Sequence, residues 1–183
     1  MKLLIMGPPG AGKGTQAKIL AEKFNLVHLS TGDILRSEID KGSSMGLEAQ
    51  SYMNAGNLVP DKVLLSMMDS TLENLKDKGL ILDGFPRTIP QAEGLSTIFK
   101  SLNQKIDYVI NIYVEKDVLV NRLVERAEKS GRADDTKEVI VNRQKVYYKL
   151  TAPVIEFYNN EIINIDGDGS IEEVTSRILN IIE

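Results

Sequence analysis

Short apolar runs alternate along the chain with longer amphipathic stretches, which is typical of stacked strand–helix–strand units. Runs 2–6, 79–82 and 107–114 are apolar almost throughout, as strands covered on both faces should be. The predicted strands are 2–6, 26–29, 79–82, 107–114 and 161–165, and the predicted helices are 13–24, 31–41, 61–77, 88–102, 116–129, 134–158 and 171–182. The pattern therefore predicts the α/β class with a mostly parallel sheet.

Two stretches depart from this alternation. Residues 31–60 pass through several glycines and serines without another apolar strand, so we interpret them as a small helical insertion. Residues 127–136 are polar and connect two predicted helices. An ordinary surface loop remains the alternative for each stretch. Since the sequence contains no internal repeat and no long linker, we expect a single domain over residues 1–183.

The composition excludes several classes of function. The chain has 22 Lys and Arg against 26 Asp and Glu, and this net charge of -4 argues against a general binder of nucleic acids or anionic membranes. It has no Cys and a single histidine, His28, which excludes a thiol nucleophile and a Cys-type zinc site and nearly excludes a Ser-His-Asp triad. No apolar run approaches the roughly 18 residues of a membrane span. Gly7 and Pro8 interrupt the first apolar run too early for a secretion signal, so we expect a soluble cytoplasmic protein.

The strongest motif is Gly7-Pro8-Pro9-Gly10-Ala11-Gly12-Lys13-Gly14-Thr15, between a predicted strand and a predicted helix. Glycines let the backbone curl so that successive N–H groups point at phosphate oxygens, and the helix N-terminus adds a favourable dipole. Lys13 supplies an ammonium group for the β- and γ-phosphates. The strict pattern has Ser or Thr directly after the Lys, whereas here Gly14 intervenes before Thr15, whose hydroxyl remains available to Mg²⁺ or phosphate. We therefore predict a phosphate-binding loop rather than an ordinary glycine turn.

A carboxylate, Asp83, follows the apolar run at 80–82. In a fold with a phosphate-binding loop, the end of such a strand is where the acid on the Mg²⁺ side is placed, often with water between them. A simple Asp-Gly turn would be the better interpretation if Asp83 stood alone. Beside the phosphate-binding loop, a metal-facing role is favoured.

Three arginines lie on or beside apolar helix faces. Arg122 and Arg126 are four residues apart and share one helix face, and Arg143 falls within the apolar stripe of another predicted helix. A guanidinium group on an inward face is costly unless it meets an anion. For any single arginine, pairing with Asp or Glu is an equally good interpretation. Several of them beside a phosphate-binding loop indicate a polyanionic ligand.

These motifs resemble the adenylate kinase family over nearly the whole chain. The resemblance is carried by residues 7–16, by Ser30-Thr31-Gly32-Asp33-Ile34-Leu35-Arg36 and by Asp83-Gly84-Phe85-Pro86-Arg87-Thr88-Ile89-Pro90-Gln91-Ala92. It continues through Arg122 and Arg126, Arg132-Ala133-Asp134-Asp135, Arg143 and Thr151-Ala152-Pro153. The fold that it implies is that of a P-loop kinase, with three α/β/α layers around a five-stranded parallel sheet.

The resemblance divides the domain into a core of residues 1–29, 60–126 and 132–183, an AMP-binding insertion at 30–59 and a short lid at 127–131. Other members of the family insert a small β-domain at the lid, sometimes with zinc held by cysteines. Because only five residues separate Arg126 from Arg132 here, we expect no zinc.

The resemblance also implies the site residues. Those implied for ATP are Gly10, Ala11, Gly12, Lys13, Gly14, Thr15, Arg122, Arg126 and Gly169. Those implied for AMP are Thr31, Arg36, Asn57, Leu58, Val59, Gly84, Phe85, Pro86, Arg87, Gln91, Arg132 and Arg143. The catalytic set is Lys13, Arg87, Arg126, Arg132 and Arg143, with Mg²⁺ held by Asp83 and Thr15 through water.

The implied reaction is the reversible transfer of the γ-phosphoryl group from ATP to AMP, giving two ADP. From the small size and single core we expect a monomer, and from the net charge we expect no nucleic-acid or membrane partner. The attacking phosphate oxygen is already anionic, so no general base is required. The amide of Gln91 can both donate and accept, as an adenine edge requires, and Thr31 stands where pyrimidine nucleotide kinases tend to carry Ala. Both residues favour AMP over UMP or CMP. Two alternatives stay open, namely another nucleoside monophosphate kinase and a nucleotide-binding sensor that transfers no phosphoryl group.

Overall fold

The strands form one parallel sheet in the computed structural model, which describes residues 1–130 and 136–183, with side chains up to residue 128 in the first range. They are β1 (Lys2–Met6), β2 (Val27–Ser30), β3 (Leu80–Asp83), β4 (Tyr108–Tyr113) and β5 (Ile162–Asp166), in the order β2-β3-β1-β4-β5. Each strand lies within one residue of its predicted bounds. The predicted α/β class with a five-stranded parallel sheet is therefore confirmed.

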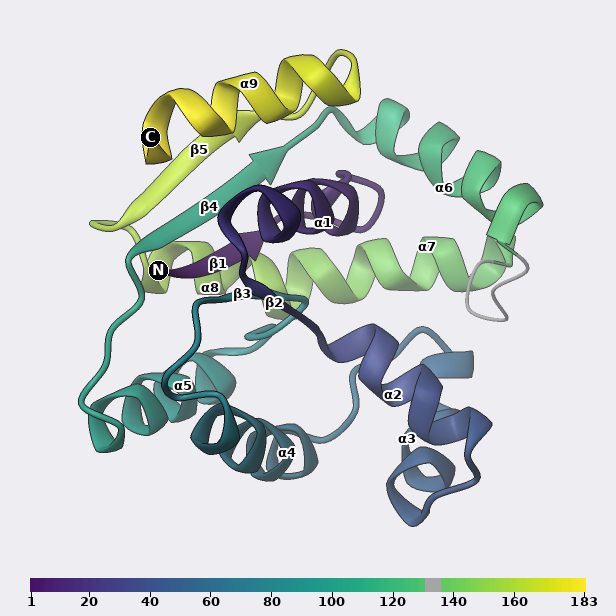
Figure 1. The fold of residues 1–183 in the computed structure, drawn as a ribbon. Helices are drawn as coiled ribbons and strands as arrows, with labels where there is room; N and C mark the ends of the chain where they lie inside the picture. The colour runs from purple at the N-terminus through teal and green to yellow at the C-terminus, as the bar shows by residue number, and fades with distance from the viewer. Residues whose placement is uncertain (131–135) are drawn as a thin grey trace.

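Helices cover both faces of this sheet (Figure 1). One face carries α1 (Lys13–Phe24), α6 (Lys116–Ser130) and α9 (Ile171–Ile182), and the other carries α4 (Asp61–Asn74), α5 (Ile89–Ser101) and α8 (Ala152–Phe157). The arrangement has the three layers that the resemblance implied. Within the part of the chain that the structure describes, no helix combines the length and the apolarity needed to cross a membrane.

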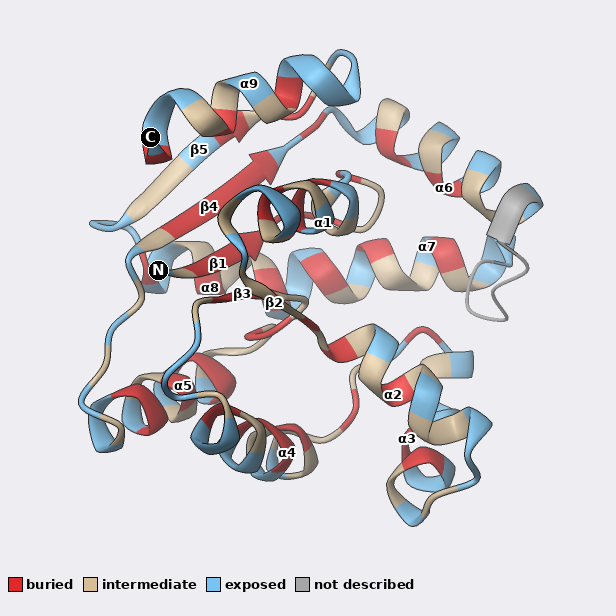
Figure 2. Cartoon of the chain, viewed as in Figure 1, coloured by how far each residue is buried: buried red, intermediate tan, exposed pale blue. Residues whose placement is uncertain are grey.

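Successive residues of the central strand β1 face two separate cores. Leu4 and Met6 pack with side chains of α4 and α5, whereas Leu3 and Ile5 pack with side chains of α1 and α9. Figure 2 shows the central strands buried along most of their length. Burying one such side chain contributes about 1.5–3 kcal/mol. The sheet is consequently held from both sides and forms a firm platform for the loops at its carboxyl edge.

The insertion between β2 and α4 is helical, as predicted. It consists of α2 (Thr31–Asp40) and α3 (Ser44–Asn54), which project away from the sheet in Figure 1. Ser30 and Ser43 begin these helices by accepting hydrogen bonds from the backbone N–H groups of Asp33 and Gly46. The two helices pack closely, because a Cβ atom at Gly46 would overlap the backbone of Glu38. The alternating pattern did not separate α3 from α2, because α3 has few buried positions.

The single helix predicted over 134–158 is wrong in its middle. The structure has α7 (Lys137–Val146), a π-helical turn η2 (Tyr147–Thr151) and then α8. Pro153, in the first turn of α8, has no N–H group to donate to the preceding turn, so the regular hydrogen-bond pattern of an α-helix cannot continue through it. The turn therefore separates the helix that borders the site from the helix that packs on the sheet.

Candidate active site

A cavity of about 780 Å³ opens at the carboxyl edge of the sheet, where parallel α/β proteins bind their ligands. Its walls come from the loop between β1 and α1, the segment after β3, the insertion, α6, α7 and the turn after β5. The cavity thus joins the predicted phosphate-binding loop to the predicted AMP-binding insertion in one continuous space. Its lining includes every predicted site residue described here except Gln91; Arg132 lies outside the described residues.

The phosphate-binding loop has the backbone conformation that its glycines predict. Gly7, Gly10 and Gly12 have φ values of 138°, 91° and 89°, which residues with a side chain rarely adopt. A Cβ atom at Gly10 would also lie 2.8 Å from the backbone carbonyl oxygen of Leu119, so this glycine lets the loop pass beneath α6. Gly12 precedes the first residue of α1 and directs the loop into the N-terminus of that helix. An anion in the cavity would face this helix end and its free N–H groups.

Lys13 lies at the start of α1 and its Nζ donates a hydrogen bond of 2.9 Å to the carbonyl oxygen of Pro8. Burial is the main cause that lowers the pKa of Lys13 to about 8. The carboxylate of Asp83 opposes this pKa shift, and the guanidinium groups of Arg87, Arg143 and Arg126 add to it. The cavity therefore concentrates positive charge from three different elements around one ammonium group, which is the electrostatic environment that a polyphosphate requires.

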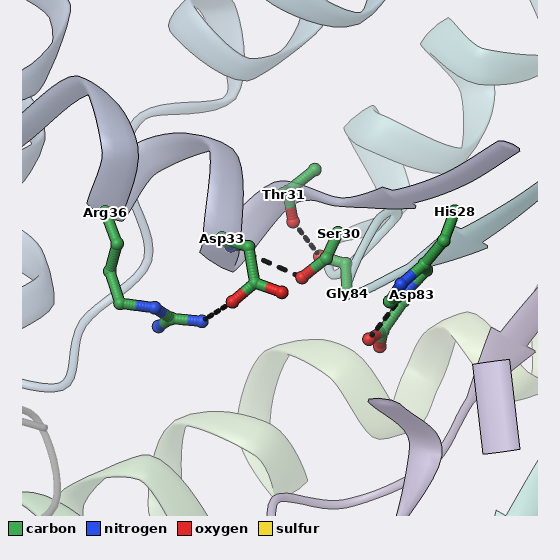
Figure 3. A network of polar contacts seen from close by, with 7 residues as sticks. All are labelled: His28, Ser30, Thr31, Asp33, Arg36, Asp83 and Gly84. Atoms are coloured by element: carbon green, nitrogen blue, oxygen red, sulfur yellow. Dashed lines mark hydrogen bonds and ion pairs between the residues drawn. The ribbon is translucent and has the colours of Figure 1, made fainter. Parts of the chain in front are cut away.

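Asp83 ends β3 and lies close enough to the Lys13 ammonium group for the two charges to interact. Its Oδ2 lies 3.4 Å from Nε2 of His28 on the neighbouring strand β2 (Figure 3). Burial raises the pKa of Asp83, but the hydrogen bond to His28 and the charges of Lys13 and Arg87 outweigh this effect and hold the pKa below its ordinary value. The group is thus an ionised oxygen donor at neutral pH. A Cβ atom on Gly14 would lie 3.3 Å from Oδ2, so the glycine that departs from the strict motif leaves space for this carboxylate.

These residues fit a magnesium ion bound mainly by phosphate. Asp83 and Thr15 both line the cavity and offer a carboxylate and a hydroxyl, the oxygen donors that Mg²⁺ prefers. Among the described residues no group of three His, Cys, Asp or Glu side chains is suitably placed to hold a metal ion. Mg²⁺ usually takes one or two carboxylates and completes its shell with waters and substrate phosphates. The donor set here matches that mode of binding.

The other end of the cavity, which we call the acceptor end, is formed by the insertion and residues 84–87. Thr31 Oγ1 and Arg87 Nε both donate hydrogen bonds to the carbonyl oxygen of Gly84, at 2.8 and 2.6 Å (Figure 3 shows the first). Arg36 forms an ion pair of 2.5 Å with Asp33 on the same helix. The residues lining this end include Thr31, Arg36, Asn57, Leu58, Val59, Gly84, Phe85, Pro86 and Arg87. Two guanidinium groups therefore border the acceptor end from α2 and from the segment after β3.

A glycine turn after β5 closes the opposite end of the cavity. Its residues Gly167 and Gly169 line the cavity, and Gly169 has φ of 110°. Arg122 Nη2 donates a hydrogen bond of 3.1 Å to the carbonyl oxygen of Gly167. Arg177 Nη1 in turn donates to the carbonyl oxygens of Asp166 and Asp168. Arg122 thus bonds to a backbone carbonyl oxygen, whereas the alternative interpretation of these arginines required pairing with Asp or Glu.

Gln91 lies behind the cavity wall. It is 0% exposed and is not among the cavity-lining residues. Its Oε1 accepts a hydrogen bond of 2.7 Å from the backbone N–H of Arg87, and its Nε2 donates one of 2.7 Å to Asp61 Oδ1. In this structure the amide of Gln91 is therefore held within the wall by two protein partners.

Three buried polar residues that the sequence analysis did not assign hold the site in place. Gln144 Nε2 donates to the carbonyl oxygen of Pro9, Thr151 Oγ1 to that of Arg87, and Gln16 Nε2 to that of Ile171. Gln144 and Thr151 belong to the buried stripe of α7 and η2, which also contains Ile140 and Tyr147. Polar residues within an apolar stripe are the signal that would have identified them.

The predicted lid at 127–131 is only partly described. The backbone of residues 127–130 forms the last turn of α6, so these residues are helical, and residue 131 lies outside the described range. His28, the single histidine, lies on the edge strand β2 with Asp83 as its hydrogen-bond partner, and it also lines the cavity.

Comparison with known proteins agrees with this geometry. The family model described as adenylate kinase matches residues 5–163. The adenylate kinase of Leptospira biflexa serovar Patoc is 50% identical over 181 residues, covering 97% of each chain. Those of Corynebacterium glutamicum (strain R) and Synechococcus sp. (strain CC9902) are 47% and 45% identical, covering 98% and 100% of this chain and 97% and 98% of theirs. The chain belongs to the adenylate kinase family.

Proposed function

We propose that the protein transfers the γ-phosphoryl group of ATP reversibly to AMP, giving two ADP, with Mg²⁺ bound to the nucleotide. The observation that carries this proposal is the single cavity with a phosphate-binding loop in its middle and a separate set of arginines at the acceptor end. A protein that only senses one nucleotide has no need for the second set. The volume of the cavity, about 780 Å³, falls within the usual range of ligand sites, roughly 300–1,000 Å³.

The donor nucleotide is assigned to the phosphate-binding loop and the glycine turn. The backbone of residues 10–15 and the ammonium group of Lys13 would bind its phosphates, with Arg126 beside them. Arg122 and the backbone of Gly169 would contact the adenine, because both lie where α6 approaches the turn after β5. This assignment places the γ-phosphate towards the centre of the cavity.

The acceptor nucleotide is assigned to the acceptor end. Arg36 and Arg87 would bind its phosphate, since they border the cavity from α2 and from the segment after β3. Arg143 lines the cavity from α7 and would lie between the two phosphates, where Arg132 is expected to join it. Planar guanidinium groups can each bind two oxygens and so offset the repulsion between two anionic substrates.

Positioning and charge neutralisation would then account for the chemistry. An oxygen of the AMP phosphate is anionic near neutral pH and attacks the γ-phosphorus while the bond to the ADP oxygen breaks, so no side chain needs to remove a proton. Lys13 and the guanidinium groups whose charges interact with it in the cavity, those of Arg87, Arg126 and Arg143, would stabilise this shared charge. Holding two substrates in line can supply several kcal/mol of the barrier reduction. Mg²⁺, held through water by Asp83 and Thr15, would add neutralising charge at the phosphates.

Exclusion of water is the remaining requirement, because water would otherwise accept the phosphoryl group. We assign it to closure of the insertion at 30–59 and of the predicted lid at 127–131 over the bound substrates. We also propose that the enzyme works in the cytoplasm as a monomer, without nucleic-acid or membrane partners and without zinc.

A panel of phosphate acceptors tests the proposal. Initial rates with ATP and each of AMP, CMP, UMP and GMP, measured with and without Mg²⁺, should show AMP as the preferred acceptor and a strict need for Mg²⁺. A preference for UMP or CMP would establish the pyrimidine alternative. Binding of ATP without binding of AMP in titration calorimetry would establish the sensor alternative.

A further inference from the structure

Asp61, the first residue of α4, holds the wall behind the acceptor end of the cavity. Its Oδ1 accepts hydrogen bonds from Gln91 Nε2 at 2.7 Å and from Thr88 Oγ1 at 3.0 Å. Asp61 is not among the cavity-lining residues, and no sequence motif singled it out. Any influence that it has on the site must therefore pass through the side chains that it holds.

Two partners with opposite requirements decide which way the Gln91 amide points. Its Oε1 accepts from the backbone N–H of Arg87, which cannot itself accept, and its Nε2 donates to the carboxylate of Asp61, which cannot donate. A reversed amide would lose both hydrogen bonds and place donor against donor and acceptor against acceptor. Because Gln91 is 0% exposed, water cannot replace the lost bonds. The protein itself therefore sets the direction of this amide.

The direction matters because 6-amino- and 6-oxopurines present opposite hydrogen-bond patterns. A 6-aminopurine offers a donor at its exocyclic nitrogen and an acceptor at N1, whereas a 6-oxopurine offers an acceptor at its oxygen and a donor at N1. Besides its protein partner, each end of the Gln91 amide can make one further hydrogen bond, through a lone pair on Oε1 and an N–H on Nε2. For a base in a given placement, one direction of the amide matches the amino pattern and the reversed direction matches the oxo pattern.

We propose that Asp61 is a specificity-determining positioning residue, which favours 6-amino- over 6-oxopurine monophosphates by fixing the direction of the Gln91 amide. This inference rests on the proposed function, with AMP as the acceptor, and on the assignment of Gln91 to its base that the family resemblance implies. The amide lies directly behind Arg87, a cavity-lining residue, so a base reaches it only when this wall moves. Asp61 lies on α4, outside the segment at residues 84–87, so its hydrogen bond holds the amide from outside that part of the wall.

The test compares AMP with inosine monophosphate as acceptors in the wild-type enzyme, Asp61→Asn, Asp61→Ala and Asp69→Ala. Asp61→Asn keeps the size of the side chain but lets it donate as well as accept, so it removes one of the two constraints on the amide. Asp61→Ala removes the partner altogether. Asp69→Ala is the matched control, because Asp69 is an exposed carboxylate on the same helix. Thermal unfolding of each variant establishes that the comparison is made between folded proteins.

We expect the ratio of kcat/KM for AMP to that for inosine monophosphate to fall about tenfold or more in Asp61→Ala, the size of one hydrogen bond to a charged group. The ratio should fall several-fold in Asp61→Asn and stay unchanged in Asp69→Ala. If Asp61→Ala does not fold, the result with Asp61→Asn decides the question. A wild-type ratio retained in the folded Asp61 variants, or an equal loss for both acceptors, would overturn the inference and leave Asp61 as structural support. A wild-type enzyme that does not prefer AMP would instead overturn the proposed choice of acceptor, whatever the variants do.

Discussion

Lys13 couples the charge of the site to pH. Its pKa of about 8 in the protein lies below the ordinary value of 10.5, chiefly because of burial. A bound triphosphate stabilises the ammonium form and raises this pKa. Binding therefore takes up a proton at pH values between the pKa of Lys13 in the free protein and its pKa in the ATP complex. The affinity for ATP without Mg²⁺ should therefore weaken above pH 8, by up to about tenfold per pH unit. Titration calorimetry in buffers of different ionisation enthalpy measures both effects. Lys13→Arg, which stays charged, should lose this pH dependence, and an identical pH dependence in that variant would contradict the assignment.

Replacing Lys13 by methionine separates catalysis from folding. The ammonium group supplies charge where the transferred phosphoryl group is stabilised, so turnover in Lys13→Met should fall about 100-fold or more. Stability should not fall, because a lysine whose pKa is lowered on folding disfavours the folded state below pH 8, and this penalty fades as the pH rises towards 10.5. Chemical denaturation at pH 7 should thus show a free energy of unfolding equal to or above that of the wild type. Near-normal turnover would remove Lys13 from the chemistry.

At the scale of elements, α9 holds the glycine turn of the donor site. Arg177 Nη1 donates to the carbonyl oxygen of Asp166 at 2.7 Å and to that of Asp168, so it braces the turn that carries Gly167 and Gly169. Arg177→Ala should raise the KM for ATP about tenfold while changing kcat and the KM for AMP little, since the acceptor end lies across the cavity. Steady-state kinetics with each substrate varied in turn measures this. Ser176→Ala is the control, because that hydroxyl bonds within its own helix. Equal increases of both KM values would show a general loosening of the fold instead.

Elements that depend on local pattern could be predicted from the sequence, and contacts between distant segments could not. The strands appear as apolar runs because both of their faces are buried, and the phosphate-binding loop is evident from its glycines and Lys13. The π-helical turn depends on Pro153 together with packing on the sheet, which a helical pattern does not reveal. The position of the Gln91 side chain behind the cavity wall is stabilised by Asp61, 30 residues earlier in the chain. Such long-range pairings are set by the folded arrangement of the helices.

At the scale of the whole molecule, α7 connects the two ends of the cavity. Gln144 on this helix holds the phosphate-binding loop through Pro9, and Arg143 lines the cavity. Its neighbour Asn142 reaches the insertion, where Nδ2 donates to the carbonyl oxygen of Ala55 at 2.7 Å and to Asn57 Oδ1 at 3.0 Å. One helix therefore touches both the part of the site assigned to the donor and the part that must move to enclose the acceptor.

Loss of the Asn142 contact should loosen the insertion without disturbing the sheet. In Asn142→Ala, the backbone amides of α2 and α3 should exchange with solvent faster, because the hydrogen bonds that connect the insertion to α7 are lost while both cores of the sheet stay intact. The KM for AMP should rise a few-fold and the KM for ATP should stay near its wild-type value. Val141→Ala, which truncates an exposed side chain of the same helix, is the matched control and should leave exchange and both KM values unchanged. Hydrogen exchange followed by mass spectrometry locates the effect. Unchanged exchange in α2 and α3 would show that the insertion is held by its own packing and that α7 does not couple the two ends of the site.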